Sequence, residues 1–207
     1  MIMIRKQSSG MARFWVGVGL LASVLISKNS GAIAAEIYQV DAAHSSFNFS
    51  VKHLTVSTVT GQFTDFNGTI QYDPADPNSF LADVVIKATS VDTRQEQRDK
   101  HLKGADFFDV EKYPAITFKS KNLTGSGTNY TITGDLTMHG VTKDISIPVT
   151  ISGPVKSPFG SKVIGLSGEA TLNRQDFGIS WNKALDAGGY VVGDEVKIMV
   201  NIEAGNK

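Results

Sequence analysis

The chain has 207 residues, of which 41% are hydrophobic, and its 20 basic and 20 acidic residues give a formal net charge of zero. This length and apolar content fit one domain of roughly 100–200 residues with its own core, and no Lys/Arg cluster offers the positive patch that attracts nucleic acids or anionic lipid surfaces. Because the chain contains no cysteine, disulfide bonds and a lipid-modified cysteine are excluded.

Residues 1–34 have the pattern of a secretory signal peptide. Three basic residues within the first 13 positions precede the apolar run 14–26, and small residues follow at 32–34. A basic start, an apolar stretch of about 7–15 residues and an A-x-A-like site are typical of such a signal. A membrane span needs roughly 20 apolar residues, whereas Lys28 ends this run.

Cleavage is expected after Ala34 or Ala35, which leaves residues 35–207 as the exported mature domain. Residues 1–34 contain four of the 20 basic residues and none of the acidic ones, so the mature chain has a net charge near −4. We therefore expect neither a nucleic-acid partner nor stable membrane insertion after cleavage.

Apolar and polar residues alternate with a period of two through most of the mature chain. Successive side chains of a strand point to opposite faces, so each segment has one apolar and one mostly hydrated face, which is typical of antiparallel sheets. Gly, Asn, Asp and Pro separate the segments, and many short strands with such turns indicate a sandwich or a barrel. The predicted strands lie near residues 36–41, 47–51, 62–72, 80–89, 115–123, 130–138, 145–151, 161–173 and 196–202.

One short helix is predicted over residues 94–103. The sequence TRQE at 93–96 has the capping-box pattern, and Gly104 stands where a C-terminal cap is expected. Leu102 is the only aliphatic side chain of the segment, so the helix is polar almost all round and is predicted to lie on the surface. The two phenylalanines at 107–108 offer an apolar contact that ties it down.

No residue pattern predicts a catalytic centre, a metal site or a cofactor. A nucleophilic serine is expected in a G-x-S-x-G elbow, which the chain lacks. The carboxylates of residues 92–111 alternate with bases on a solvated helix, which favours ion pairs and caps over an acid–base pair in a pocket. No two of the histidines have the i,i+4 helical spacing of a zinc site; they are His44, His53, His101 and His139.

The apolar strand faces are more informative. An eight-stranded barrel is wide enough either to be filled by its side chains or to hold one small ligand, and periodicity does not distinguish these two interiors. If the interior is open, its lining is predicted from the apolar phase of each strand and one neighbouring tryptophan. The candidate ligand-binding residues are Phe47, Phe49, Phe63, Ile86, Phe118, Ile132, Leu136, Ile147, Leu166, Leu172, Trp181 and Val200.

Five segments of the chain resemble the YceI-like family of bacterial periplasmic polyisoprenoid-binding proteins. They are YQVDAAHSSFNFSVKHL (38–54), GQFTDFNGTI (61–70), the charged stretch 90–118, GDLTMHGVTKDI (134–145) and the C-terminal stretch 172–204. The resemblance covers essentially the whole mature chain in order. It implies an all-β, lipocalin-like, extended antiparallel β-barrel of about eight strands with one short surface helix. It also implies an elongated cavity for a long isoprenoid or other fatty chain, and no established catalytic activity.

Three functions stay open at this point. The first is an exported soluble protein that binds a long-chain isoprenoid or other lipid-like molecule for transport, storage or stress protection. The second is an enzyme acting on a lipid-like substrate, suggested by His44, His101 and nearby carboxylates, and the third is a filled-core stress protein without a ligand. Arg98, His101 and Lys103 are candidates to contact a ligand head group, and a homodimer is left open.

Overall fold

The computed structural model describes residues 1–3, 35–186 and 188–206. The chain divides into two units, Met1–Ile33 and Ala34–Lys207, and the strands and helices described below belong to the second unit. The predicted signal peptide lies almost entirely outside the described residues, so the signal peptide and its cleavage point stay predictions. No helix within the described part of the chain has the length and hydropathy needed to cross a membrane.

Strands dominate the second unit. The helical elements are α1 (Glu96–Lys103) and the short 3-10 turns η1 (Pro77–Ser79), η2 (Ala88–Ser90) and η3 (Arg174–Phe177). The strands are β1 (Glu36–Val40), β2 (Ser46–His53), β3 (Ser57–Phe63), β4 (Phe66–Tyr72), β5 (Leu81–Lys87), β6 (Val91–Asp92), β7 (Ala115–Ser126), β8 (Asn129–Met138), β9 (Val141–Lys156), β10 (Lys162–Asn173) and β11 (Val192–Gly205).

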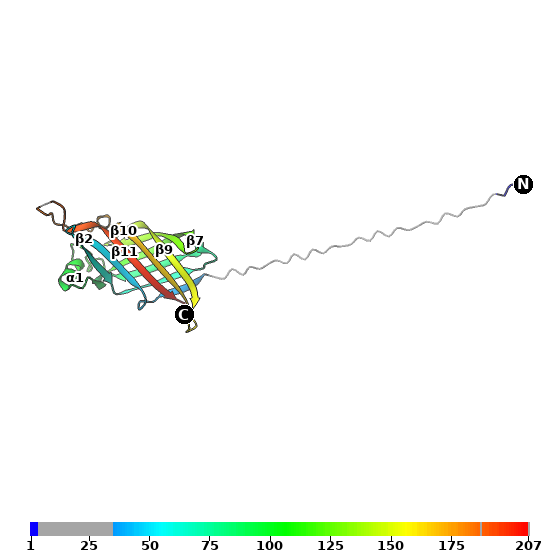
Figure 1. Cartoon of the computed structure of the whole chain (residues 1–207), viewed down its shortest axis with the longest axis horizontal. Helices are drawn as coiled ribbons and strands as arrows, with labels where there is room; N and C mark the ends of the chain where they lie inside the picture. The colour runs from blue at the N-terminus through cyan, green and yellow to red at the C-terminus, as the bar shows by residue number, and fades with distance from the viewer. Residues whose placement is uncertain (4–34, 187, 207) are drawn as a thin grey trace. The chain divides into compact units, whose positions relative to one another are not determined.

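These strands form one antiparallel sheet that closes into a barrel (Figure 1). Neighbours follow the order β1-β4-β5-β7-β8-β9-β10-β11, and β1 pairs back onto β11 through Gln39 and Val40. Strand β2 pairs with β11, β3 with β2 and β6 with β3, so these three strands continue β1, β4 and β5 along the barrel. The result is a closed barrel of eight antiparallel ribbons, which confirms the predicted fold class.

The two ends of the barrel differ. At the closed end, where short connections join β4 to β5 and β7 to β8, large rings fill the interior: Tyr38, Tyr72, Phe80 and Tyr130 are all buried. Burial raises the pKa of Tyr38 and of Tyr72 to about 12, and the Tyr38 hydroxyl donates to a Glu36 carboxylate oxygen at 3.0 Å. At the opposite end, the mouth end, lie α1 and the long connection between β10 and β11 (Figure 1).

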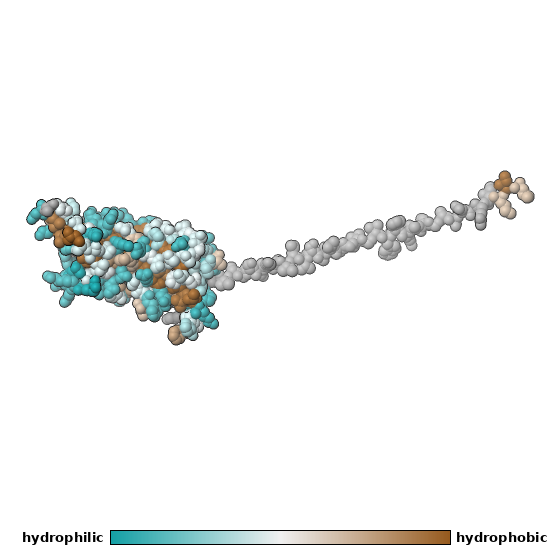
Figure 2. All heavy atoms as spheres, in the orientation of Figure 1, coloured by the Kyte–Doolittle hydropathy of each residue, from teal (hydrophilic) through white to brown (hydrophobic). Residues whose placement is uncertain are grey.

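The outer surface of the barrel is largely polar, as the alternation of the strands predicts. Figure 2 shows hydrophilic and weakly polar residues over most of the visible outer face of the barrel, with apolar residues confined to small patches. The large exposed apolar side chains include Val56 and Tyr190 at the mouth end and Leu81 and Phe159 at the closed end. A homodimer stays a prediction.

Two segments depart from the sequence-based expectation. The predicted strand 62–72 is two strands, β3 and β4, and β3 begins at Ser57. The sequence did not predict residues 57–61 because the side chains of β3 are all at least partly exposed and give little apolar signal. The helix begins at Glu96, and its N-terminal cap is Gln95, whose side chain accepts from the Arg98 N–H. Thr93 is held instead by Asp99, whose Oδ1 accepts from the Thr93 N–H at 2.8 Å, so the predicted capping box is wrong.

At a bulge in β7, the backbone of this strand lies close to Gly134 of the neighbouring strand β8. Lys121 is the inserted residue, and beside it Gly134 of β8 pairs with β7. A Cβ at Gly134 would overlap the Lys119 carbonyl oxygen and lie 2.7 Å from the Phe118 ring. We therefore expect Gly134→Ala to lower the free energy of unfolding by about 1–3 kcal/mol, as overpacking typically does.

Urea unfolding with Gly165→Ala as the control tests this expectation. A Cβ at Gly165 would meet its nearest neighbour only at 3.9 Å, so alanine there is expected to leave stability unchanged or slightly higher, since it reduces the freedom of the unfolded chain. Equal stability losses in the two variants would contradict the close packing at Gly134.

Candidate functional site

The barrel encloses a cavity of about 210 Å³. Its wall receives side chains from all eight ribbons and, at the mouth end, from Leu102, Phe107, Phe108 and Ile179. An engineered apolar cavity of about 150 Å³ already binds benzene. The interior of this barrel is therefore hollow rather than filled, and it has room for a hydrocarbon group.

The sequence predicted most of this wall. The candidate residues that line the cavity are Phe47, Phe49, Phe63, Ile86, Phe118, Ile132, Leu136, Ile147, Leu166, Leu172 and Val200. They are brought to one face by the strand register, in which Phe118 pairs with Leu136 and Ile132 pairs with Ile147. That these side chains contact a bound ligand stays a prediction.

Trp181, the remaining candidate, is not among the lining residues. Its ring packs against the rings of His101 and Phe107, with centroid distances of 5.0 and 5.3 Å. Trp181 lies in the irregular connection between β10 and β11, where strand periodicity does not tell which way a side chain points. That Trp181 contacts a ligand stays a prediction.

Among the described residues that line the cavity, Asn48 and Arg174 are the two polar ones. Asn48 lies between the inward-facing Phe47 and Phe49 of β2, and its amide donates to the hydroxyl of Ser46, which is on the same outer face of the strand, at 3.0 Å. No sequence pattern indicated Arg174. It lies just past β10 in η3, where the regular alternation has ended.

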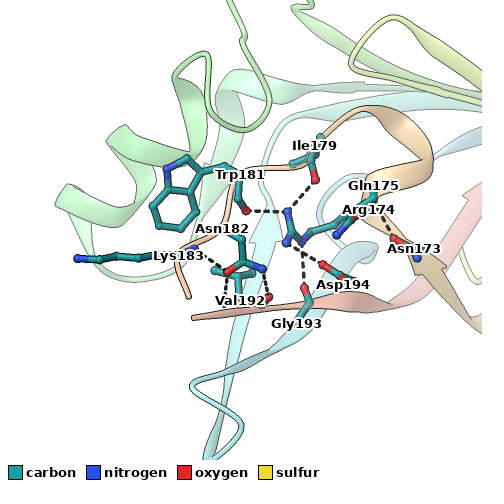
Figure 3. A network of polar contacts seen from close by, with 10 residues as sticks. All are labelled: Asn173, Arg174, Gln175, Ile179, Trp181, Asn182, Lys183, Val192, Gly193 and Asp194. Atoms are coloured by element: carbon teal, nitrogen blue, oxygen red, sulfur yellow. Dashed lines mark hydrogen bonds and ion pairs between the residues drawn. The ribbon is translucent and has the colours of Figure 1, made fainter. Parts of the chain in front are cut away.

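The Arg174 guanidinium is engaged by protein groups (Figure 3). Its Nε donates to the Gly193 carbonyl at 3.0 Å, and its Nη1 donates to the carbonyls of Ile179 at 2.7 Å and Trp181 at 2.9 Å. Its Nη2 donates to Asp194 Oδ1 at 2.8 Å. Because a guanidinium has five N–H donors, four of which are used here, Arg174 ties the mouth connection to the start of β11.

A second cluster of polar groups lies outside the cavity wall. Asp41, His44 and Glu203 place one possible metal-ligating atom each within 4.8 Å of one another, and they are the described residues that form such a group. His44 Nδ1 lies 2.8 Å from Asp41 Oδ2, and this hydrogen bond raises the pKa of His44 and lowers the pKa of Asp41. Because His44 Nδ1 is engaged by this hydrogen bond to Asp41, we interpret the cluster as an exposed hydrogen-bonded network.

The histidines that suggested an enzyme are not brought into one site. His44 lies in the connection between β1 and β2, whereas His101 belongs to α1, and its Nε2 lies 2.9 Å from Asp106 Oδ2. Neither histidine lines the cavity.

A closed antiparallel barrel around an apolar cavity is the architecture of lipocalin-like proteins. Among known families, the YceI-like domain matches residues 38–204. The chain therefore belongs to the YceI-like family.

Individual relatives agree with this assignment. The UPF0312 protein SA2479 of Staphylococcus aureus is 38% identical over 167 residues, which cover 80% of this chain and 95% of the relative. The crystal structure of Burkholderia cenocepacia BcnA is similar with a TM-score of 0.70 at 27% identity, covering 79% of this chain and 98% of BcnA. A structure described as a polyisoprenoid binding domain from Saccharophagus degradans has a TM-score of 0.63 at 18% identity, over 82% of this chain and 98% of that domain, and shows the shared fold.

Proposed function

We propose that this protein is exported to the periplasm and there binds a long-chain isoprenoid or another lipid-like molecule inside its barrel. The observation that carries the proposal is the cavity, whose described wall is apolar except for Asn48 and Arg174. Each buried methylene contributes about 0.8 kcal/mol, so about ten of them contribute on the order of 8 kcal/mol before the cost of ordering a flexible chain. Affinity therefore comes mainly from the length of hydrocarbon that is covered.

The polar part of such a ligand stays at the mouth end. A charged group deep in the cavity would lose its hydration among apolar side chains, since the lining residue Arg174, at the mouth end, gives four of its five N–H donors to protein groups. Of the head-group contacts suggested by the sequence, Arg98 donates to Thr93 and His101 pairs with Asp106. Lys103 is still proposed to contact an anionic head group.

Export and the isoprenoid nature of the ligand have separate support. The basic start, apolar run and small residues of 1–34 support export through a signal peptide. Family membership supports a binding role, and the domain from Saccharophagus degradans suggests polyisoprenoids as the first ligands to test. We propose transport, storage or stress protection as the role of binding, without covalent change to the ligand.

Organic extraction of the protein purified from the periplasm, followed by mass spectrometry, tests the proposal. A chain-like apolar molecule in near-equimolar amount is the expected result, together with an N-terminus at Ala35 or Glu36. Repeated absence of any such molecule, with no uptake of added geranylgeraniol by the delipidated protein, would favour the alternative of a stress protein that binds no ligand. Turnover of the alcohol that is lost in His44→Ala or His101→Ala would favour the enzyme.

A further inference from the structure

Residues 95–110, called the mouth lid below, form part of the cavity wall without belonging to the barrel. The lid consists of α1 and the turn that follows it, at the mouth end of the barrel (Figure 1). Its inner side presents Leu102, Phe107 and Phe108 to the cavity, whereas α1 itself contains no buried residue. Displacing the lid would therefore expose little helix surface, and its main cost would be the exposure of the buried Phe107 and of the Phe108 ring, which packs on Phe63 of β3 at a centroid distance of 5.6 Å.

The backbone of the lid is bonded to itself. The Phe108 N–H donates to the Leu102 carbonyl at 2.9 Å, the Val110 N–H to the Lys103 carbonyl at 3.1 Å, and the Phe107 N–H to a carbonyl of the same turn. Over the described residues, no backbone hydrogen bond or ion pair joins residues 95–110 to a barrel strand. Side-chain hydrogen bonds of Asp99 and Arg98 tie the lid to Thr93, which precedes the lid and lies outside the strands. The lid is thus held together internally and can move as one body by giving up the bonds to this one residue, whereas opening the barrel wall would break the hydrogen bonds of a strand ladder.

The link into the lid is a suitable hinge. Arg94 immediately precedes the lid and has a φ of 62°, in the left-handed region that non-glycine residues rarely adopt. Hinges are commonly a few loop residues that absorb a change in φ and ψ. On the far side of Arg94 the chain is anchored at β6, whose Asp92 pairs with Gln62 of β3.

At its other end, the lid touches an aromatic residue that is held in place by the opposite rim. The rings of His101 and Phe107 contact the Trp181 ring at centroid distances of 5.0 and 5.3 Å. The Trp181 carbonyl accepts from Arg174, and the next residue, Asn182, exchanges two hydrogen bonds with Val192 at the start of β11 (Figure 3). Trp181 is therefore a fixed point against which the lid closes.

We propose that the mouth lid swings away from Trp181 to admit and release the ligand, and that the His101–Phe107–Trp181 cluster is the latch that sets the exchange rate. This inference rests on the proposed binding function and adds to it the route of exchange and the residues that control the route. Trp181 acts here through the lid and not through contact with the bound chain, in agreement with its place outside the cavity lining.

Stopped-flow fluorescence with the uncharged apolar probe N-phenyl-1-naphthylamine tests the latch. Because Trp181 makes two of the aromatic contacts that hold the closed lid, Trp181→Ala is expected to raise the association and dissociation rate constants of the probe together, by about tenfold, with Kd unchanged within about twofold. Trp181→Phe, which retains an aromatic ring, is expected to restore most of the slow exchange. Tyr190→Ala alters an exposed ring of the same connection and is expected to leave both rates unchanged.

Two kinetic outcomes would overturn the latch. A rise in the dissociation rate alone would mean that Trp181 contacts the bound chain directly. Unchanged rates in Trp181→Ala would mean that exchange does not pass this cluster.

Hydrogen exchange of the ligand-free protein separates failure of the latch from failure of the proposed function. The amides of residues 95–110 are expected to exchange as one group and faster than those of β7–β11, and Trp181→Ala is expected to accelerate only that group. If the wild-type protein does not bind the probe, the proposed function fails, and the exchange of the lid amides still decides the latch. Unchanged lid exchange in Trp181→Ala would overturn it.

Discussion

Replacing Leu136 with aspartate is expected to lower the free energy of unfolding by about 3–5 kcal/mol, the usual cost of a buried charge without a partner, and to abolish recovery of a bound ligand. Leu136 is 8% exposed, lines the cavity and belongs to the same apolar cluster as Ile116 and Phe177. Arg174, the charged residue among the described lining residues, lies at the mouth end and gives four of its five N–H donors to protein groups. A carboxylate at position 136 would therefore have neither a counter-ion nor a donor.

The neighbouring variant Thr137→Asp is the matched control. Thr137 is on the opposite face of β8, where its hydroxyl lies 2.8 Å from that of Thr142 in an exposed position, so we expect a change within about 0.5 kcal/mol. Urea unfolding and mass spectrometry of extracts measure the two effects. Similar losses from both variants would show that the two faces of β8 are assigned wrongly.

The Leu136→Asp variant should also acquire a pH dependence of known sign. Burial raises the pKa of a carboxyl group in the folded state above its unfolded value. The folded state then binds protons more tightly than the unfolded state, so the stability loss is small at pH values below the unfolded pKa and grows as the pH rises above it. Unfolding curves of this variant that do not change between acid and neutral pH would contradict burial of the new carboxyl.

Replacing Arg174 with methionine is expected to lower the free energy of unfolding by about 3 kcal/mol, because hydrogen bonds of charged groups typically contribute about 1.5–3 kcal/mol. The variant leaves the carbonyls of Gly193, Ile179 and Trp181 without their donor at the mouth. The carboxylate of Asp194 is 40% exposed and can be hydrated, so its contribution is small. Arg174→Lys is expected to recover little of the loss, since one ammonium group cannot reach the same set of acceptors.

Lys197→Met provides the comparison for this second variant. Lys197 also forms an ion pair, with Glu169 at 2.6 Å, but both side chains are about half exposed. Such surface pairs contribute about 0–1 kcal/mol, so a small change is expected in urea unfolding. An Arg174→Met variant that is no less stable than Lys197→Met would contradict a structural role for the buried network.

The sequence was sufficient for the barrel wall because the wall is built from regular strands. One period-two pattern places Phe118, Ile132, Leu136 and Ile147 on the inner face, and the structure brings these four together. The pattern could not show whether the interior is filled by side chains, because a filled core and a hollow one have the same alternation. The volume left between the walls depends on how all eight ribbons curve together.

The mouth was not predictable in the same way, because it is made of irregular segments. Arg174, Ile179 and Trp181 follow the end of β10, and Phe107 follows a polar helix, so no repeating spacing reveals which of them face inward. Their positions depend on hydrogen bonds between segments distant in sequence, such as that from Arg174 to Gly193. The pair of phenylalanines at 107–108 was the one local signal of an apolar contact there.

The buried rings of Tyr38, Tyr72, Phe80 and Tyr130 fill one end of the barrel, so the barrel is a tube with one blind end. A ligand that is longer than the cavity cannot pass through the filled end and must leave its last carbons in water at the mouth end. The binding affinity should then rise with each added isoprene unit only until the cavity is full, and stay constant for longer ligands. In this way the buried rings set the length of hydrocarbon that contributes to binding.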